Sequence, residues 1–109
     1  MVEVYEGKVP AEDVPDLLAE WGSFIKLAVD VAAHVIAAGG EMHADCELAL
    51  LDRESAQEDI WGADWIPAER EVRFESLINI RPAQGNRSTV IRDSALRAAV
   101  EQIVRDAFE

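Results

Sequence analysis

Apolar and polar residues alternate with a period of two in three stretches of the chain, residues 24–31, 41–50 and 72–81. Successive side chains of a β-strand point to opposite faces of a sheet, so this period is typical of half-buried strands. The β-branched residues within 34–38 favour a hairpin partner for the first stretch. One helix over residues 28–38 is the alternative, because alanine is the strongest helix former.

Helices are expected at both ends of the chain, after a short opening strand at residues 2–5. Pro10, followed by acidic residues, suits the first turn of a helix, and Gly22 suits its end. Asp93 is a good N-cap for a closing helix. The apolar residues of the first helix are Leu17, Leu18 and Trp21, and those of the last follow a helical period at Leu96, Ala99, Val100, Ile103, Val104 and Ala107.

A shorter helix is predicted in the middle of the chain. Ser55 and Glu58 match a capping box, so the helix should run to Trp61 and stop at Gly62, with residues 65–67 as a loop. With 109 residues and a mass of 12.0 kDa, the chain has room for one hydrophobic core. We therefore predict a single small α+β domain over residues 1–109, an antiparallel sheet of about four strands with the N- and C-terminal helices packed on one face.

The chain is strongly acidic, with a formal net charge of −12. Residues 1–52 hold 11 Asp and Glu against two lysines, a net charge of −9, whereas residues 53–109 hold 11 against eight arginines, a net charge of −3. This acidity argues against nucleic acid and against anionic membrane surfaces as partners. The C-terminal half is the better place for an anion.

The single cysteine, Cys46, excludes an internal disulfide and gives no sign of an oxidising compartment. It lies among the apolar positions of its stretch, which favours a buried and inert thiol. The N-terminus has no basic and apolar signal pattern, so we expect a cytoplasmic protein. His34 is expected at the hairpin, and Trp21, Trp61 and Trp65 are expected in the core.

The residues His43, Asp45 and Glu47 share one face of the strand predicted at residues 41–50. An imidazole beside two carboxylates suits general acid–base catalysis, and all three are also metal-ligand types. A solvated strand face is the plainer interpretation. In a helix, His43 and Glu47 would again share a face, because they are four residues apart.

The second cluster of candidate residues is Asn79, Arg81, Asn86, Arg87 and Ser88, at the end of a predicted strand and in the loop after it. Two guanidinium groups with amides and a hydroxyl suit an anion pocket for phosphate or carboxylate. The alternative is an internal lattice in which Arg81 pairs with Asp45 or Glu47. In that case the cluster only stabilises the fold.

Taken in order, three segments resemble the family known as domain of unknown function 5674, and the likeness covers nearly the whole chain. The segments are Met42-His43-Ala44-Asp45 with Glu47 and Leu50, then Ser55 with Gln57-Glu58-Asp59-Ile60-Trp61-Gly62, then Ile78-Asn79-Ile80-Arg81-Pro82-Ala83-Gln84-Gly85-Asn86-Arg87-Ser88. The resemblance implies a small stand-alone prokaryotic protein and no particular activity. It identifies no cofactor.

The leading functional prediction is a small cytoplasmic protein with a polar pocket for a phosphorylated or carboxylated ligand. His43, Asp45 and Glu47 would face the arginine cluster, and hydrolysis with His43 or Glu47 as general base is consistent with these residue types. The alternative is a structural or protein-interaction module, with residues 61–67 as a docking surface. A third hypothesis is an acidic protein that sequesters a basic partner.

Overall fold

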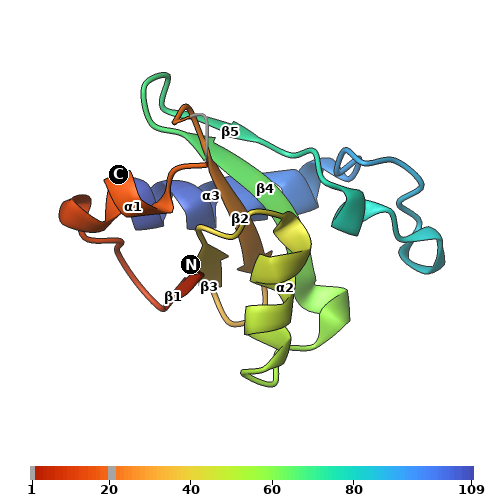
Figure 1. The fold of residues 1–109 in the computed structure, drawn as a ribbon. Coiled ribbons are helices and arrows are strands. Elements are labelled where there is room, and N and C mark those ends of the chain that lie inside the picture. The colour runs from red at the N-terminus through yellow and green to blue at the C-terminus, as the bar shows by residue number, and fades with distance from the viewer. Residues whose placement is uncertain (1, 20–21) are drawn as a thin grey trace.

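The computed structural model describes residues 2–19 and 22–109, and it contains a five-stranded antiparallel sheet (Figure 1). In spatial order the strands are β1 (Glu3–Tyr5), β3 (Val35–Ala38), β2 (Ile25–Asp30), β4 (Ile60–Ile66) and β5 (Glu71–Arg73). The predicted α+β class is confirmed, with five strands where about four are expected.

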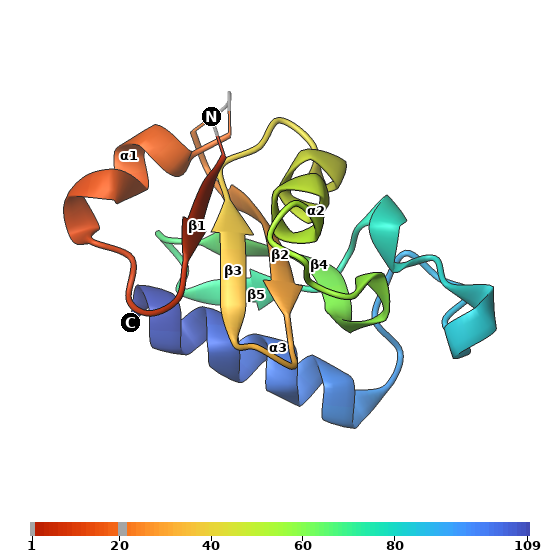
Figure 2. The same ribbon diagram turned by 90° about the horizontal axis from the view of Figure 1, so that it is seen from below.

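Helices cover both faces of this sheet (Figure 2). The long C-terminal helix α3 (Ser94–Phe108) packs on one face, and the same apolar cluster includes Leu17 of the short helix α1 (Val14–Leu17). The predicted packing of the N- and C-terminal helices on one face is therefore confirmed. A helix that the sequence does not predict, α2 (His43–Leu51), lies against the opposite face.

The closing helix α3 begins where the sequence predicts. The Asp93 carboxylate accepts hydrogen bonds from the backbone N–H groups of Ala95 at 2.8 Å and Leu96 at 3.0 Å, which caps the helix. Of the predicted apolar face, Val100, Ile103, Val104 and Ala107 are buried and Leu96 is half-buried, whereas Ala99 is exposed. Its last turn is anchored by Phe108, whose ring stacks on Trp65 with a centroid distance of 5.6 Å.

The predicted hairpin of residues 24–38 is confirmed as β2 and β3, so the alternative single helix is wrong. Its turn includes His34, which has a φ of 58°. The turn is stabilised by the buried Asp30 carboxylate, which accepts the N–H groups of Ala32 and Ala33, each at 3.0 Å, and the Ser55 hydroxyl at 2.6 Å. The predicted opening strand is also present, as β1 on the free edge of β3.

The prediction of a strand at residues 41–50 is wrong, because these residues form α2. Alanine, leucine and glutamate favour a helix in this segment, and the Asp45 carboxylate reaches back to the N–H of Met42 at 3.0 Å. Within the helix the buried residues Cys46 and Leu50 are four positions apart and face the sheet. Leu48, which follows the same alternation, is mostly exposed.

Two further predictions are wrong in the middle of the chain. Ser55 bonds to Asp30 and caps no α-helix, and residues 57–59 form only the 3₁₀ turn η2 (Gln57–Asp59). The residues expected to end that helix and to form the loop after it belong instead to the central strand β4. A central strand is buried on both faces and does not alternate. The strand predicted at residues 72–81 ends at Arg73 and continues as the 3₁₀ turn η3 (Leu77–Asn79).

Two of the three tryptophans, Trp61 and Trp65, lie in the core as predicted. The alternative docking surface at residues 61–67 is wrong for the same reason, because every residue of β4 is buried. Trp21 and its predicted place on the N-terminal helix lie outside the described residues, and α1 ends at Leu17, before the predicted stop at Gly22. Among the described residues, we find no helix whose length and apolar character would let it cross a membrane.

Candidate functional site

Asn79 is fully buried and attaches η3 to the central strand. Its side-chain oxygen accepts the N–H of Gly62 at 2.8 Å, and its side-chain nitrogen donates to the carbonyls of Gly62 at 3.0 Å and of Phe74 and Thr89 at 3.2 Å. The chain approaches β4 so closely here that a Cβ on Gly62 would lie 2.6 Å from the Cβ of Ser76. Asn79 therefore holds η3 against β4 at a position where β4 has room only for the glycine Gly62.

Asn86 closes the loop that follows. Its side-chain nitrogen donates to the carbonyls of Asn79 at 2.7 Å, Ser88 at 2.9 Å and Val90 at 3.1 Å, and its oxygen accepts the N–H of Arg92 at 3.0 Å. The loop turns through the 3₁₀ turn η4 (Pro82–Gln84). All the polar atoms of this buried amide are thus used within the protein.

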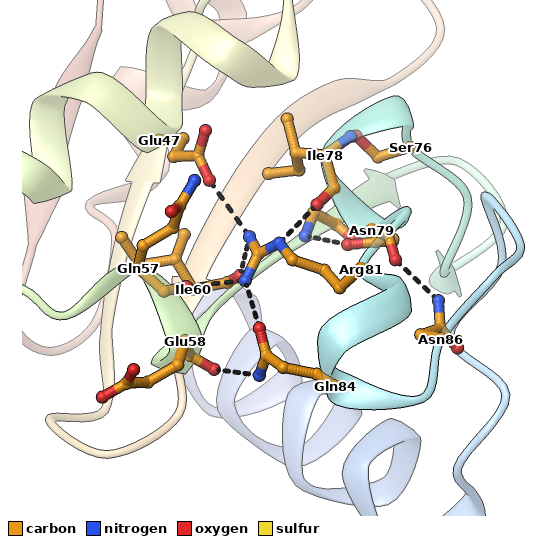
Figure 3. A network of polar contacts seen from close by, with 11 residues as sticks. Glu47, Gln57, Glu58, Ile60, Ser76, Ile78, Asn79, Arg81, Gln84 and Asn86 are labelled. Atoms are coloured by element: carbon orange, nitrogen blue, oxygen red, sulfur yellow. Dashed lines mark hydrogen bonds and ion pairs between the residues drawn. The ribbon is translucent and has the colours of Figure 1, made fainter.

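Arg81 is at the centre of a polar network between α2, η2 and η4 (Figure 3). Its five N–H groups donate to five protein acceptors, the Glu47 carboxylate at 3.0 Å, the Gln84 side chain at 3.2 Å, and the carbonyls of Gln57 at 2.7 Å, Ile60 at 2.7 Å and Ile78 at 2.9 Å. The guanidinium also lies 5.0 Å from the ring centroid of Trp61. In this arrangement it has no donor left for an external anion.

The pairing of Arg81 with Glu47 that the sequence suggests is present, with side chains only 10% and 14% exposed. Glu47 contacts Arg81 from helix α2, and not from a neighbouring strand as the sequence suggests. Asp45, the middle residue of the predicted triplet, caps α2 by accepting the N–H of Met42. The predicted catalytic triplet is therefore divided between separate tasks.

The last two predicted ligand residues lie apart from this network. Ser88 accepts the N–H of Val90 at 3.1 Å, which stabilises the turn that it begins. Arg87 is exposed, and no hydrogen bond or ion pair of its side chain is found within residues 2–19 and 22–109. A pocket of about 390 Å³ lies near this loop, with Arg92 and Asp93 among its lining residues.

His43 begins α2 and contacts the central strand. Its Nε2 lies 2.7 Å from the Asp64 carboxylate and 3.2 Å from the Ala63 carbonyl. The side chain of His43 is 15% exposed and that of Asp64 is 13% exposed. Both neighbours of Nε2 are acceptors, so this nitrogen carries the hydrogen and Nδ1 holds the lone pair of the neutral ring. The sequence analysis does not identify Asp64 as a site residue. The one sign of it in the sequence is that a carboxylate interrupts the apolar run of residues 60–66.

Asp64 lies in a row of charged residues across the α2 side of the sheet. In the strand register it is opposite Lys26 on β2 and Arg73 on β5, and such neighbours have Cβ atoms about 5 Å apart. Among the described residues neither cation is within ion-pair distance of a carboxylate. Lys26 instead donates to the backbone carbonyl of Glu41.

A pocket of about 200 Å³ opens beside His43 and Lys26. Its other lining residues are Met42, Ala44, Ser76, Leu77 and Ile78. One wall is therefore the N-terminal turn of α2, and the other is the segment that Asn79 fastens to β4. We call this cavity the His43 pocket.

The thiol of Cys46 lies buried beneath α2, as predicted, and donates to the Lys26 carbonyl at 3.6 Å. Burial raises its pKa to about 11, which keeps it protonated at neutral pH. Residues 2–19 and 22–109 contain no group of three or more His, Cys, Asp and Glu side chains arranged to hold a metal ion.

Comparison with known proteins gives one finding. Residues 3–107 match the family model described as "Protein of unknown function (DUF5674)". Neither the curated proteins nor the solved structures contain a significant match. Since the match covers nearly the whole chain, the predicted resemblance is confirmed and the protein belongs to the DUF5674 family.

Proposed function

We propose that the protein binds a small phosphorylated or carboxylated ligand in the His43 pocket, and that His43 is its acid–base group. The observation that carries this proposal is the place of His43, whose Nε2 lies 2.7 Å from Asp64, on the wall of a pocket that Lys26 also lines. An imidazole oriented by a carboxylate is a recurrent arrangement in acid–base catalysis.

The binding argument begins with the charges around the pocket. The Lys26 ammonium has three N–H groups and gives one to the Glu41 carbonyl, so donors remain for an anion. His43 and Ala44 open a nine-residue helix, whose first N–H groups and dipole favour negative charge; the N–H of the N-cap Met42 is already bonded to Asp45. In a chain of net charge −12, the Lys26 ammonium is the cation that the pocket offers to an anion.

The chemical argument rests on the orientation of the imidazole. Because Nε2–H is held by Asp64 and the Ala63 carbonyl, Nδ1 is the atom that accepts a proton from a water molecule or a ligand hydroxyl. Asp64 then stabilises the imidazolium that forms. Lys26 is placed to stabilise negative charge on the ligand, so hydrolysis of a small ester or phosphate monoester is the reaction that suits the pocket.

The other predicted site residues support the pocket indirectly. Asn79 and Asn86 hold the segment that supplies Leu77 and Ile78 to its wall. Arg81, through Glu47, ties that segment to α2. We therefore assign these residues positioning roles and place the ligand contacts on Lys26 and His43.

The chain offers matched controls for a binding test. It has two histidines and two lysines, and His34 and Lys8 are both exposed and outside the His43 pocket. In NMR spectra of the imidazole nitrogens, His43 should be the Nε2–H tautomer, and inorganic phosphate or acetate should shift its signals but not those of His34. Lys26→Met should abolish the shift, whereas Lys8→Met should retain it. If the signals of His43 do not respond to either anion, the proposal fails.

Hydrolysis needs its own measurement. Turnover of 4-nitrophenyl phosphate or 4-nitrophenyl acetate should be lost in His43→Gln and kept in His34→Gln. Anion binding without turnover of either compound would refute the hydrolytic part and leave the binding site. Equal turnover in the two variants would show that His43 takes no part.

A further inference from the structure

Within the described part of the chain, the large apolar side chains that remain exposed are concentrated on one side of the molecule. They are Met42 at 59%, Leu48 at 57%, Leu51 at 36%, Leu77 at 77% and Ile80 at 44% exposed. All belong to α2 and its N-cap or to η3 and the residue that follows it. Apolar residues gathered in this way mark interaction surfaces more often than single exposed ones do.

Helix geometry aligns one half of this surface. Ala44, Leu48 and Leu51 are spaced i, i+4 and i+7, so they form one stripe along the outward side of α2, and all three are exposed. Leu77 and Ile80 project from the neighbouring segment, and Ala44 and Leu77 line the same pocket. We call these five residues the α2–η3 face.

The residues that flank α2, on one half of the α2–η3 face, are mostly acidic. Glu41 precedes α2, and Asp52 and Glu54 follow it; all three are exposed. The one nearby cation in this stretch, Arg53, is already paired with Glu6. An apolar stripe with an acidic border is complementary to an apolar stripe with a basic border.

We propose that the α2–η3 face binds a cationic amphipathic helix of a partner protein. A helix laid along α2 would cover Leu48 and Leu51 with its apolar side and bring lysines or arginines to Asp52 and Glu54. A second copy of this chain is disfavoured, because each copy carries a net charge of −12. An anionic membrane surface is disfavoured by the same repulsion.

This inference is independent of the His43 pocket. The face shares Ala44 and Leu77 with the pocket wall, but Leu48, Leu51 and Ile80 are not among the pocket's lining residues. Lys26→Met should therefore remove the phosphate response and keep helix binding. The double variant Leu48→Ser/Leu51→Ser should lose helix binding and keep the phosphate response.

The test uses a synthetic amphipathic helix with a leucine stripe and lysines on its polar side, followed by fluorescence anisotropy with the full-length protein. Two peptides serve as controls, one with glutamates in place of the lysines and one with the leucines scrambled. We expect binding of the lysine peptide alone, and a weakening of about tenfold or more in Leu48→Ser/Leu51→Ser. Both side chains are exposed, so this variant should remain folded, with a thermal midpoint only a few degrees below that of the parent because serine favours a helix less than leucine does.

A second pair of variants tests the charged border. Glu41→Gln/Asp52→Asn should weaken binding about threefold and flatten its salt dependence, whereas the remote and equally exposed pair Glu12→Gln/Glu69→Gln should change neither. Equal binding of the glutamate or scrambled peptide, or unchanged binding by Leu48→Ser/Leu51→Ser, overturns the proposal. A dimer in sedimentation experiments that this double variant dissociates would overturn it too, since the face would then belong to a second copy.

Discussion

The side-chain amide of Asn79 pairs with both backbone groups of Gly62, accepting its N–H at 2.8 Å and donating to its carbonyl at 3.0 Å. The two residues are 17 positions apart in the chain. An amide is the side chain that offers a donor and an acceptor side by side, as the edge of a strand does. Through this contact, the irregular segment after β5 is attached to the middle strand of the sheet.

Replacement of Asn79 by leucine should destabilise the protein strongly. Leucine has a similar volume, but it leaves the buried N–H and carbonyl of Gly62 without partners, each at a cost of about 1–3 kcal/mol, whereas the Phe74 and Thr89 carbonyls keep their backbone donors. We expect a loss of roughly 3 kcal/mol or more in the free energy of unfolding, measured by urea denaturation. Arg87→Leu, at an exposed position of the following loop, is the control and should cost less than about 1 kcal/mol. A small loss for Asn79→Leu would contradict the fastening role.

Gly62→Ala should also be costly, and the cost should depend on Ser76. The added Cβ would lie 2.6 Å from the Cβ and 2.7 Å from the hydroxyl oxygen of Ser76, so overpacking should cost roughly 1–3 kcal/mol. In a Ser76→Gly background the same substitution should cost at least about 1 kcal/mol less, because the two closest atoms are gone and only the Ile78 Cγ1, at 3.0 Å, remains. If the costs of Gly62→Ala and Ser76→Gly are simply additive, the clash with Ser76 is relieved by a backbone shift and does not set the cost.

Arg81 and Glu47 should contribute unequally to stability. Arg81→Met removes five hydrogen bonds and leaves a largely buried carboxylate unpaired, so we expect a loss of about 3–5 kcal/mol. Glu47→Gln keeps an acceptor for the guanidinium, which retains its four other partners, and should cost about 1 kcal/mol. Denaturation curves of the two variants decide this. If Arg81→Met keeps full stability but abolishes the phosphate response, Arg81 is a ligand residue and its assignment as a positioning residue is wrong.

Cys46 should be inert in the folded protein and should influence its alkaline stability. Burial raises its pKa from 9.0 to about 11. Below pH 9 the thiol is protonated in both states; between pH 9 and 11 it ionises first in the unfolded chain, so stability falls as the pH rises. The loss should approach roughly 2–3 kcal/mol.

Two measurements check the Cys46 prediction. At pH 8 a thiol reagent should label the native protein slowly and the urea-unfolded protein at once. The stability of Cys46→Ala should decline less steeply than that of the parent between pH 9 and 11. The single tyrosine also titrates at high pH, since burial and the hydrogen bond to Asp13 raise the pKa of Tyr5 to about 12, but its contribution is common to both proteins. Rapid labelling of the native protein at pH 8 would contradict the burial of Cys46.

Local patterns in the sequence are sufficient for part of the fold. The helix α3 combines a cap at Asp93 with a stripe of apolar residues at helical spacing, and both signals act within a few residues. The β2–β3 hairpin is equally local, because its strands are adjacent in the chain and rich in β-branched residues. The sequence also carries the family resemblance and the suggestion that Arg81 pairs with Glu47.

Only the tertiary structure decides the remaining elements. Residues 41–50 satisfy a period of two as well as a helix with Cys46 and Leu50 on one side, and contact with the α2 side of the sheet selects the helix. The run at residues 60–66 has no alternation because a central strand is buried on both faces. The spacing of apolar residues identifies a helix or strand that buries one face. It gives no answer for a strand that is buried on both faces, or for a segment in which a helix and a strand would bury the same residues.

The same limit applies to the candidate site. The sequence indicates His43 and the arginine cluster as chemically capable residues, because head-group chemistry is visible in the residue types. The partner of His43, Asp64, is 21 positions away and becomes a neighbour only when α2 packs on β4. Whether a guanidinium such as that of Arg81 is open to a ligand depends on the carbonyls around it. These belong to two separate stretches of the chain, residues 57–60 and 78–84, which only folding brings together.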